Sequence, residues 1–67
     1  MITVKINGQQ QTWEQPMTVQ QYLQTQGHTT ERVAVEQNGR IVPKSAYAAQ
    51  SIEDGDAVEV VSFVGGG

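Results

Sequence analysis

Three glycines, Gly65, Gly66 and Gly67, end the printed sequence directly after Phe63 and Val64. Glycine side chains carry no chemistry, so a reactive group in this segment would be the α-carboxylate of Gly67. Because glycine has no Cβ, other groups can approach its backbone closely, and it adopts φ values that other residues avoid. Four extended residues span roughly 13 Å, which would let the segment enter a narrow active site in another protein. The alternatives are a disordered tail or a cloning remnant.

The rest of the composition offers few groups for catalysis or metal binding. A chain of 67 residues makes one domain at most and has little room for a ligand pocket of ordinary volume. It contains no cysteine and one histidine, His28, so disulfides and thiolate metal sites are excluded and no set of metal ligands is evident. We therefore predict no catalytic residue and no metal site in the chain, and we expect that it is not an enzyme.

Charge and hydropathy limit the kinds of partner. The formal net charge is −3, from four Lys and Arg against seven Asp and Glu, and no basic cluster is present that could bind a phosphate backbone. An acidic protein of this size is better suited to a basic protein surface. No apolar run approaches the length that crosses a membrane, and the first residues lack the pattern of a signal peptide. These features predict a soluble cytoplasmic protein that binds neither nucleic acid nor membranes.

The first residues predict a β-hairpin. Apolar and polar residues alternate over residues 1–6, as in a half-buried strand, and the apolar members are Ile2, Val4 and Ile6. Asn7-Gly8 tolerates the positive φ values of a tight hairpin turn. We expect the returning strand at about residues 9–14. A two- or four-residue loop places Trp13 in the core, whereas a three-residue loop would turn it outward.

A short helix is predicted after the hairpin. Thr18 can cap its first turn, and Gln21 lies three residues further on, as a capping box requires. Gly27 is suited to the left-handed conformation that ends many helices. One apolar stripe follows the helical spacing and is expected to face the core, and it consists of Val19, Tyr22 and Leu23.

Further strands follow the helix. The remaining expected elements are a strand at 33–36, a turn at 37–40, a return through Ile41-Val42 that Pro43 ends, a helical turn at about 46–49, a turn at Asp54-Gly55-Asp56 and a last strand at 57–63. This order predicts an α+β domain in two layers, with the helix across one face of the sheet. The pairing of the first strand with the last does not follow from local patterns.

The last strand presents apolar residues on both faces. Val58 and Val60 form the better core set, because the alternate positions include Glu59, which belongs in water. Val61 and Phe63 then lie on the opposite face beside the glycines, and together with Glu59 they form a candidate docking patch. The alternative is that Phe63 folds back over the edge of the core. The acidic residues near this strand either stabilise turns or pair with basic residues of a partner, and they are Glu53, Asp54, Asp56 and Glu59.

Several of these features occur together: the strand at 1–6, the short helix capped by Thr18, Ile41-Val42-Pro43, Asp54-Gly55-Asp56 and Phe63-Val64-Gly65-Gly66-Gly67. In this order and at this length they resemble the ThiS family, the sulfur carrier proteins of thiamine biosynthesis. The resemblance implies a β-grasp, ubiquitin-like α+β fold, with a mixed sheet and one main helix packed on one face. It also implies a domain over residues 1–63 and a flexible glycine tail over residues 64–67.

The resemblance further implies a chemistry for Gly67. In this family an E1-like adenylating enzyme of the ThiF type uses ATP and magnesium to activate the C-terminal carboxylate. Sulfur from a cysteine persulfide, which a cysteine desulfurase makes, then displaces AMP and leaves a thiocarboxylate. Thiazole synthase of the ThiG type takes this sulfur to build the thiazole phosphate of thiamine. Gly66 and Gly67 match the essential glycine pair of the family, Gly65 adds reach, and the chain binds no cofactor of its own.

Three other functions remain open from the sequence. The small subunit of molybdopterin synthase has the same fold and the same thiocarboxylate chemistry, but it is usually somewhat longer. A ubiquitin-like protein modifier shares the activation step and joins its terminal glycine to a lysine. A passive β-grasp interaction module would make no use of its glycines.

Overall fold

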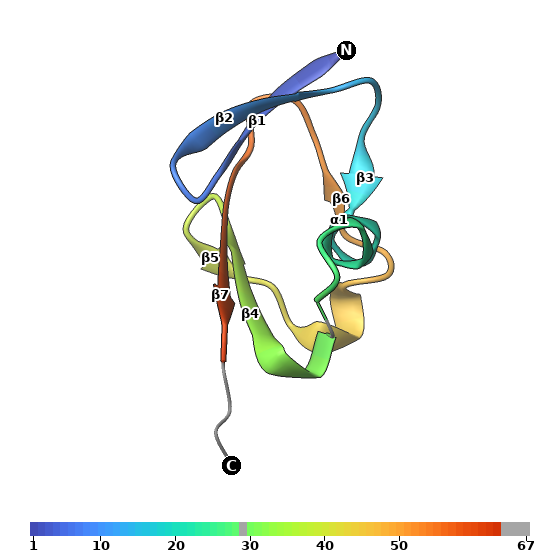
Figure 1. The fold of residues 1–67 in the computed structure, drawn as a ribbon, viewed down its shortest axis with the longest axis vertical. Coiled ribbons are helices and arrows are strands. Elements are labelled where there is room, and N and C mark those ends of the chain that lie inside the picture. Colours follow the sequence, from blue (N-terminus) through green and yellow to red (C-terminus); the bar gives the residue numbers. More distant parts are fainter. Residues whose placement is uncertain (29, 64–67) are drawn as a thin grey trace.

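The protein folds as two layers, with a five-stranded sheet covered on one face by a helix (Figure 1). The computed structural model describes residues 1–28 and 30–63. Its elements in chain order are β1 (Ile2–Ile6), β2 (Gln9–Trp13), β3 (Met17–Thr18), α1 (Val19–Thr25), the 3-10 helix η1 (Thr30–Arg32), β4 (Val33–Gln37), β5 (Arg40–Ile41), the 3-10 helix η2 (Lys44–Ala46), β6 (Ser51–Ile52) and β7 (Ala57–Ser62).

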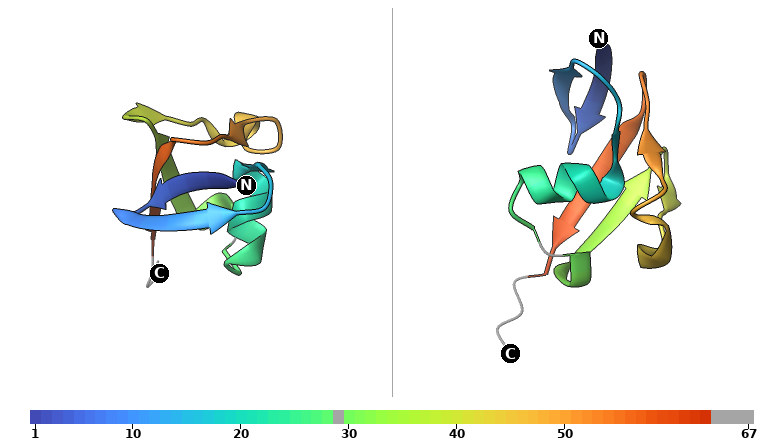
Figure 2. Two further views of the ribbon diagram at one scale, coloured as in Figure 1. Left: turned by 90° about the horizontal axis from the view of Figure 1, so that it is seen from above. Right: turned by 90° about the vertical axis from the view of Figure 1, so that its right-hand side faces the viewer.

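The last strand, β7, lies at the centre of the sheet, whose order is β2-β1-β7-β4-β5. β1 runs parallel to β7 and pairs with it through Lys5 and Ile6. On its other side β7 runs antiparallel to β4 along the whole of that strand. The sheet is therefore mixed, as expected, and α1 crosses one of its faces (Figure 2). We call the opposite face of the sheet, turned away from α1, the outer face.

Two Asn-Gly turns set the hairpins of the sheet. Asn7 has a φ of 52° and Gly8 a φ of 81°, and the second turn repeats these values with 54° at Asn38 and 81° at Gly39. Positive φ at both central residues gives a two-residue turn whose twist matches that of the flanking strands. The first hairpin therefore pairs Ile2 with Trp13. Trp13 is 9% exposed, so its predicted place in the core is confirmed.

Both ends of α1 are closed as the sequence predicts. The Oγ1 of Thr18 accepts the N–H of Gln21 at 3.1 Å, and the Oε1 of Gln21 accepts the N–H of Thr18 at 2.9 Å, which completes a capping box. At the other end Gly27 has a φ of 74°. The N–H of His28 donates to the carbonyl of Leu23 at 3.0 Å, and this bond satisfies a carbonyl that the helix leaves open.

The core lies between α1 and the inner face of the sheet. Its members are Val4, Ile6, Trp13, Val19, Tyr22, Leu23, Val33, Val35, Val42, Tyr47, Ile52 and Val58. Trp13 and Tyr22 stack with ring centroids 5.4 Å apart, which joins the first hairpin to the helix. Ile52 is fully buried, although no local pattern marked it, because the short strand β6 pairs with β3 beside the start of the helix.

The connection between β5 and β6 contains the predicted helical turn, since the N–H groups of Ala49 and Gln50 donate to the carbonyl of Ala46. A 3-10 helix that was not predicted precedes this turn and begins at Lys44. Pro43 has a φ of −67° and lies directly before it, and this restricted geometry favours a helical turn that starts at the next residue. The turn brings Tyr47 into the core, where its side chain is 2% exposed.

Asp56 is the centre of a polar network that closes the turn before β7. Its Oδ2 accepts the Nε2 of Gln37 at 2.7 Å and the N–H of Glu53 at 2.8 Å, and its Oδ1 accepts the Nδ2 of Asn38 at 2.9 Å. Burial raises the pKa of the Asp56 carboxyl, but the hydrogen bonds from Glu53, Asn38 and Gln37 lower it, and the net pKa lies below its usual value.

The network predicts that folding stability depends on pH through Asp56. Because the pKa is lower in the folded chain than in the unfolded chain, the carboxylate stabilises the fold above its unfolded-state pKa, and this contribution is lost as pH falls through the folded-state pKa. We expect Asp56→Asn to have a lower urea midpoint at neutral pH, because its amide would face two donors. Its midpoint should also change less on acidification than that of the wild-type chain.

The matched control is Glu14→Gln, which changes an exposed carboxylate and should leave the pH profile of the urea midpoint as in the wild type. A wild-type pH profile in Asp56→Asn would contradict the role assigned to the network.

Candidate functional site

The C-terminal end of β7 is held on both of its edges. On the side of β4, the N–H of Phe63 donates to the carbonyl of Arg32 at 2.7 Å, so the hydrogen-bonded ladder continues one residue beyond the strand. On the side of β1, direct pairing ends at Val58. The predicted tail, with Gly65, Gly66 and Gly67, lies outside the described residues. The described chain is therefore anchored as far as Phe63.

Asn7 continues the β1 edge after the strand itself has turned away. Its backbone N–H donates to the carbonyl of Val58 at 2.9 Å. Its side chain then contacts Val60 twice, because Oδ1 accepts the N–H of Val60 at 2.8 Å and Nδ2 donates to the carbonyl of Val60 at 3.3 Å. The side-chain amide of Asn7 thus makes the hydrogen bonds to β7 that a further residue of β1 would make. It holds the part of β7 that leads toward the glycines.

The alternation predicted for β7 is confirmed. Val58 is 1% exposed and faces the core, and Val60 packs against the core from the same side. Val61 and Phe63 are each 54% exposed. The alternative in which Phe63 closes over the core is therefore wrong. On the neighbouring strand Ala34 lies opposite Val61, which widens the exposed apolar area at this end of the outer face.

Three of the four acidic residues near β7 act within the molecule. Asp54 accepts the N–H of Thr3 at 2.8 Å, and Glu53 accepts the hydroxyl of Ser51. Asp56 holds the network described above. The turn role is therefore the observed one for these three carboxylates, whereas Glu59 points into solvent from the outer face.

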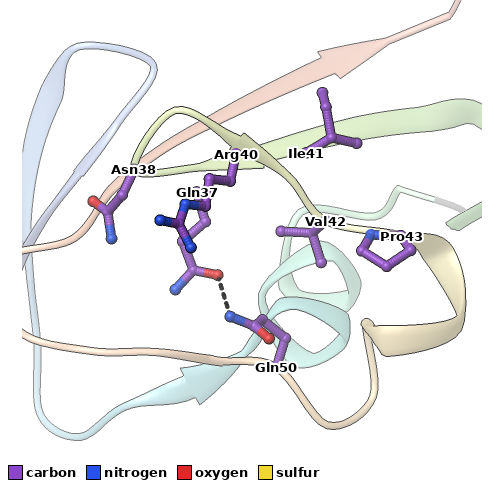
Figure 3. A pocket seen from close by; sticks show the side chains of 7 residues that line it. All are labelled: Gln37, Asn38, Arg40, Ile41, Val42, Pro43 and Gln50. Atoms are coloured by element: carbon purple, nitrogen blue, oxygen red, sulfur yellow. Dashed lines mark hydrogen bonds between the residues drawn. The ribbon is translucent and has the colours of Figure 1, made fainter.

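A hollow beside the β4–β5 hairpin has a volume of about 480 Å³ (Figure 3). Its polar wall contains Gln37, which is 8% exposed. The Nε2 of Gln50 donates to the Oε1 of Gln37 at 3.0 Å, and the Nε2 of Gln37 donates to Asp56 and to the carbonyl of Ser51. Both the oxygen and the nitrogen of the Gln37 amide are therefore hydrogen-bonded within the protein. This hollow lies at the Gln37 end of β4, whereas the C-terminal end of β7 pairs with the other end of β4 through Ser62.

Sequence reasoning did not single out Gln37, although a signal was present. Period-two alternation from Val33 and Val35 places residue 37 on the inner face, where its amide needs partners. Within residues 1–28 and 30–63, no group of three His, Cys, Asp or Glu side chains is placed to hold a metal ion. No helix in the same part of the chain is long and apolar enough to cross a membrane.

The fold defines the class of the protein. A mixed sheet with its last strand in the centre, parallel to the first strand, and with one α-helix across one face in the described residues is the β-grasp, or ubiquitin-like, arrangement. The apolar residues beside the C-terminal end of β7 are positioned where such a domain could meet a partner.

Comparison with known proteins identifies the family. The sequence matches the ThiS family over residues 4–67. The sulfur carrier protein ThiS of Bacillus subtilis is 34% identical over 65 residues, which cover 96% of this chain and 98% of that protein. The crystal structure of the thiamine biosynthesis protein ThiS from Geobacter metallireducens superposes with a TM-score of 0.82 at 33% identity, covering 98% of this chain and 100% of that chain. The chain belongs to the ThiS family, the sulfur carriers of thiamine biosynthesis.

A longer relative has a different name. The thiazole synthase of Paramagnetospirillum magneticum is 47% identical over 62 residues, which are 92% of this chain but only 19% of that protein. The chain therefore spans about a fifth of the length of this relative. In that protein, a segment similar to the whole β-grasp domain belongs to the same polypeptide as the rest of a thiazole synthase.

The role of Asn7 can be tested with a matched substitution in the second turn. Asn7→Gly keeps the positive φ but removes both side-chain bonds to Val60, and we expect a loss of about 1 kcal/mol in the free energy of unfolding. Amide hydrogen exchange by NMR should become faster at Val60 and in the last residues of β7.

Asn38→Gly is the control, because Asn38 has nearly the same φ and its Oδ1 accepts the N–H of Ala57 at the other end of β7. It should speed exchange at Ala57 and leave Val60 protected. Equal protection of Val60 in both variants would show that Asn7 does not anchor this end of the strand.

Proposed function

We propose that the chain carries sulfur as a thiocarboxylate on Gly67 and delivers it to thiazole synthase. The observation that supports this most directly is the match to the ThiS family through residue 67, together with a sulfur carrier from Bacillus subtilis that aligns over nearly its whole length. The geometry supports the proposal, since hydrogen bonds anchor β7 and Phe63, and the sequence continues through Val64 to the three glycines.

The reaction needs an activated carboxylate. A carboxylate resists nucleophilic attack, because its negative charge is shared over two oxygens and neither is a good leaving group. In the proposed reaction an E1-like enzyme uses ATP and magnesium to join the Gly67 carboxylate to AMP, and pyrophosphate leaves. The terminal sulfur of a cysteine persulfide then displaces AMP and joins Gly67 in an acyl disulfide. A thiol cleaves the S–S bond, which leaves the thiocarboxylate on Gly67 and forms a disulfide. The persulfide is supplied by a cysteine desulfurase.

The chain acts in this scheme as a co-substrate rather than a catalyst. Gly65 and Gly66 have no Cβ and would let the backbone pass close to the walls of a partner's active site. ATP and magnesium belong to the activating enzyme. The thiazole synthase from Paramagnetospirillum magneticum, in which a similar segment forms part of the chain, supports thiazole synthase as the acceptor of the sulfur.

The docking patch of Glu59, Val61 and Phe63 would orient the carrier on its partners. Val61 and Phe63, which precede the glycines closely in the sequence, expose more than half of their surface. Apolar contact on this face would add affinity through burial of surface. The Glu59 carboxylate would attract and orient a basic surface.

Deletion of Gly67 tests the reactive group. The 67-residue chain is incubated with the E1-like enzyme of its host, ATP, magnesium, cysteine and a desulfurase, and its intact mass is measured. We expect a gain equal to the replacement of one oxygen by one sulfur, and no gain in the deletion variant. The unfolding midpoint of the variant should match the wild type, because β7 ends at Ser62.

Addition of thiazole synthase and its substrates should return the mass of the carrier to the carboxylate form. If an active enzyme produces no gain in the wild-type chain, the proposal fails. The same mass measurement with the activating enzymes of molybdopterin synthesis and of protein modification would then separate those two alternatives.

Phe63→Ala tests the docking patch. Because the side chain is half exposed, its loss should lower the unfolding midpoint only slightly, whereas the KM for the carrier in the adenylation or thiazole reaction should rise several-fold. Val35→Ala is the contrasting control, since Val35 is 1% exposed and its truncation should cost about 2 kcal/mol or more of stability. A collapse of the midpoint in Phe63→Ala with a normal KM would place Phe63 in the core.

A further inference from the structure

Two glutamates lie directly opposite each other on the outer face. Glu36 of β4 pairs in register with Glu59 of β7, and both side chains are exposed. The N–H of Asn38 donates to the carbonyl of Ala57, two residues along from Glu36 and Glu59. Because hydrogen-bonded and non-hydrogen-bonded pairs alternate in an antiparallel ladder, Glu36 and Glu59 also form a hydrogen-bonded pair. Their Cα atoms are therefore about 5.5 Å apart, and the two carboxylates project from adjacent points.

Like charges in this position oppose folding of the free carrier. Directly opposite residues on one face of an antiparallel pair interact, and equal charges there are destabilising. Within the described residues, the carboxylates that accept hydrogen bonds are those of Glu53, Asp54 and Asp56 rather than those of Glu36 and Glu59. The basic residue nearest in register is Lys5, which pairs with Ala57 and lies only diagonally from Glu59.

Exposed apolar side chains flank the two carboxylates. Ile41 of β5 lies opposite Glu36 in register and is 68% exposed. Directly paired residues share a face of a sheet, so Ile41 lies on the outer face with Glu36, and it also lines the hollow (Figure 3). Val61 follows Glu59 by one full period on the same face. Two carboxylates, from β4 and β7, thus lie next to apolar side chains of β5 and β7.

We propose that this surface, formed by Glu36, Ile41, Glu59 and Val61, binds an arginine of thiazole synthase. The proposal rests on the sulfur carrier function argued above, and it extends the contact area beyond β7 to β4 and β5. A guanidinium offers five donors in a plane and so can hydrogen-bond two carboxylates at once. Its weakly hydrated faces also suit the apolar side chains on either side, which a compact ammonium group does less well.

Charge complementarity determines the kind of partner. Two exposed carboxylates would repel phosphate backbones and anionic lipid surfaces, and they attract a cationic protein group. A relative at 47% identity supports thiazole synthase as the partner, because it is itself a thiazole synthase that contains a segment similar to this chain. In such a protein the domain and the synthase are always close together.

The test compares the direction in which each glutamate substitution changes stability and affinity for thiazole synthase. Glu36→Gln and Glu59→Gln should each raise the unfolding midpoint, because each removes the repulsion, while weakening binding of the unmodified carrier to purified thiazole synthase by roughly tenfold or more. Binding is measured by titration calorimetry at low and at physiological ionic strength. A residue with only a structural role would not move stability and affinity in opposite directions.

The double variant tests whether one cation contacts both carboxylates. Since the two groups would share one guanidinium, the loss of affinity in the double variant should be smaller than the product of the two single losses. The salt dependence of binding should also become weaker. Glu14→Gln is the matched control: it removes the same charge from an exposed residue outside this face and should change neither quantity.

Ile41→Thr tests the apolar part of the surface. Because the side chain is mostly exposed, the midpoint should stay near the wild-type value while affinity for thiazole synthase falls several-fold. Wild-type affinity in both glutamate variants, or an equal loss in Glu14→Gln, would overturn the proposal. Weakened binding to the adenylating enzyme with unchanged binding to thiazole synthase would overturn the choice of partner.

The experiments distinguish failure of the arginine site from failure of the sulfur carrier function. Binding is measured on the unmodified chain and does not require sulfur transfer. A mass gain on Gly67 with unaffected binding of the glutamate variants would retain the carrier function and reject the arginine site.

Discussion

The structure depends on satisfying the backbone of β7 along both edges. A central strand has no solvent to bond its N–H and C=O groups, so each edge needs a partner. β4 supplies one edge along its entire length, whereas β1 supplies only the start of the other, and the side chain of Asn7 bonds Val60 beyond that point. The hairpins from the two halves of the chain join the sheet only through β7, and α1 packs across the resulting surface.

The same strand also carries the surface that we propose faces partners. Because side chains alternate along a strand, Val58 stabilises the core while Glu59 and Val61 point outward from neighbouring positions. The residues that would contact a partner are thus attached to the most securely paired backbone in the molecule. The proposed function needs this arrangement, since Gly67 would follow the domain by a few residues and the domain would have to present it in a defined direction.

The acidic residues around β7 divide into two groups with different tasks. Those in the turn before the strand accept hydrogen bonds from nearby donors and hold Gln37 and Asn38 in place. Glu59 and Glu36 instead face each other across two strands, where their repulsion is a cost in the free protein. Residues near one another in sequence can therefore serve the fold or a partner, according to the donors that the tertiary structure places beside them.

The sequence by itself determined the features that arise from residues a few positions apart. The Asn-Gly turns, the capping box of Thr18 and Gln21 and the alternation along β7 depend on local φ values, short hydrogen bonds and strand geometry, and all are found as predicted. Its resemblance to the ThiS family also led to the correct fold. Only the tertiary structure decided the parallel pairing of β1 with β7, the burial of Ile52 and the meeting of Glu36 with Glu59. These features join distant segments, and their pairing is set by packing of the whole chain rather than by the preferences of neighbouring residues.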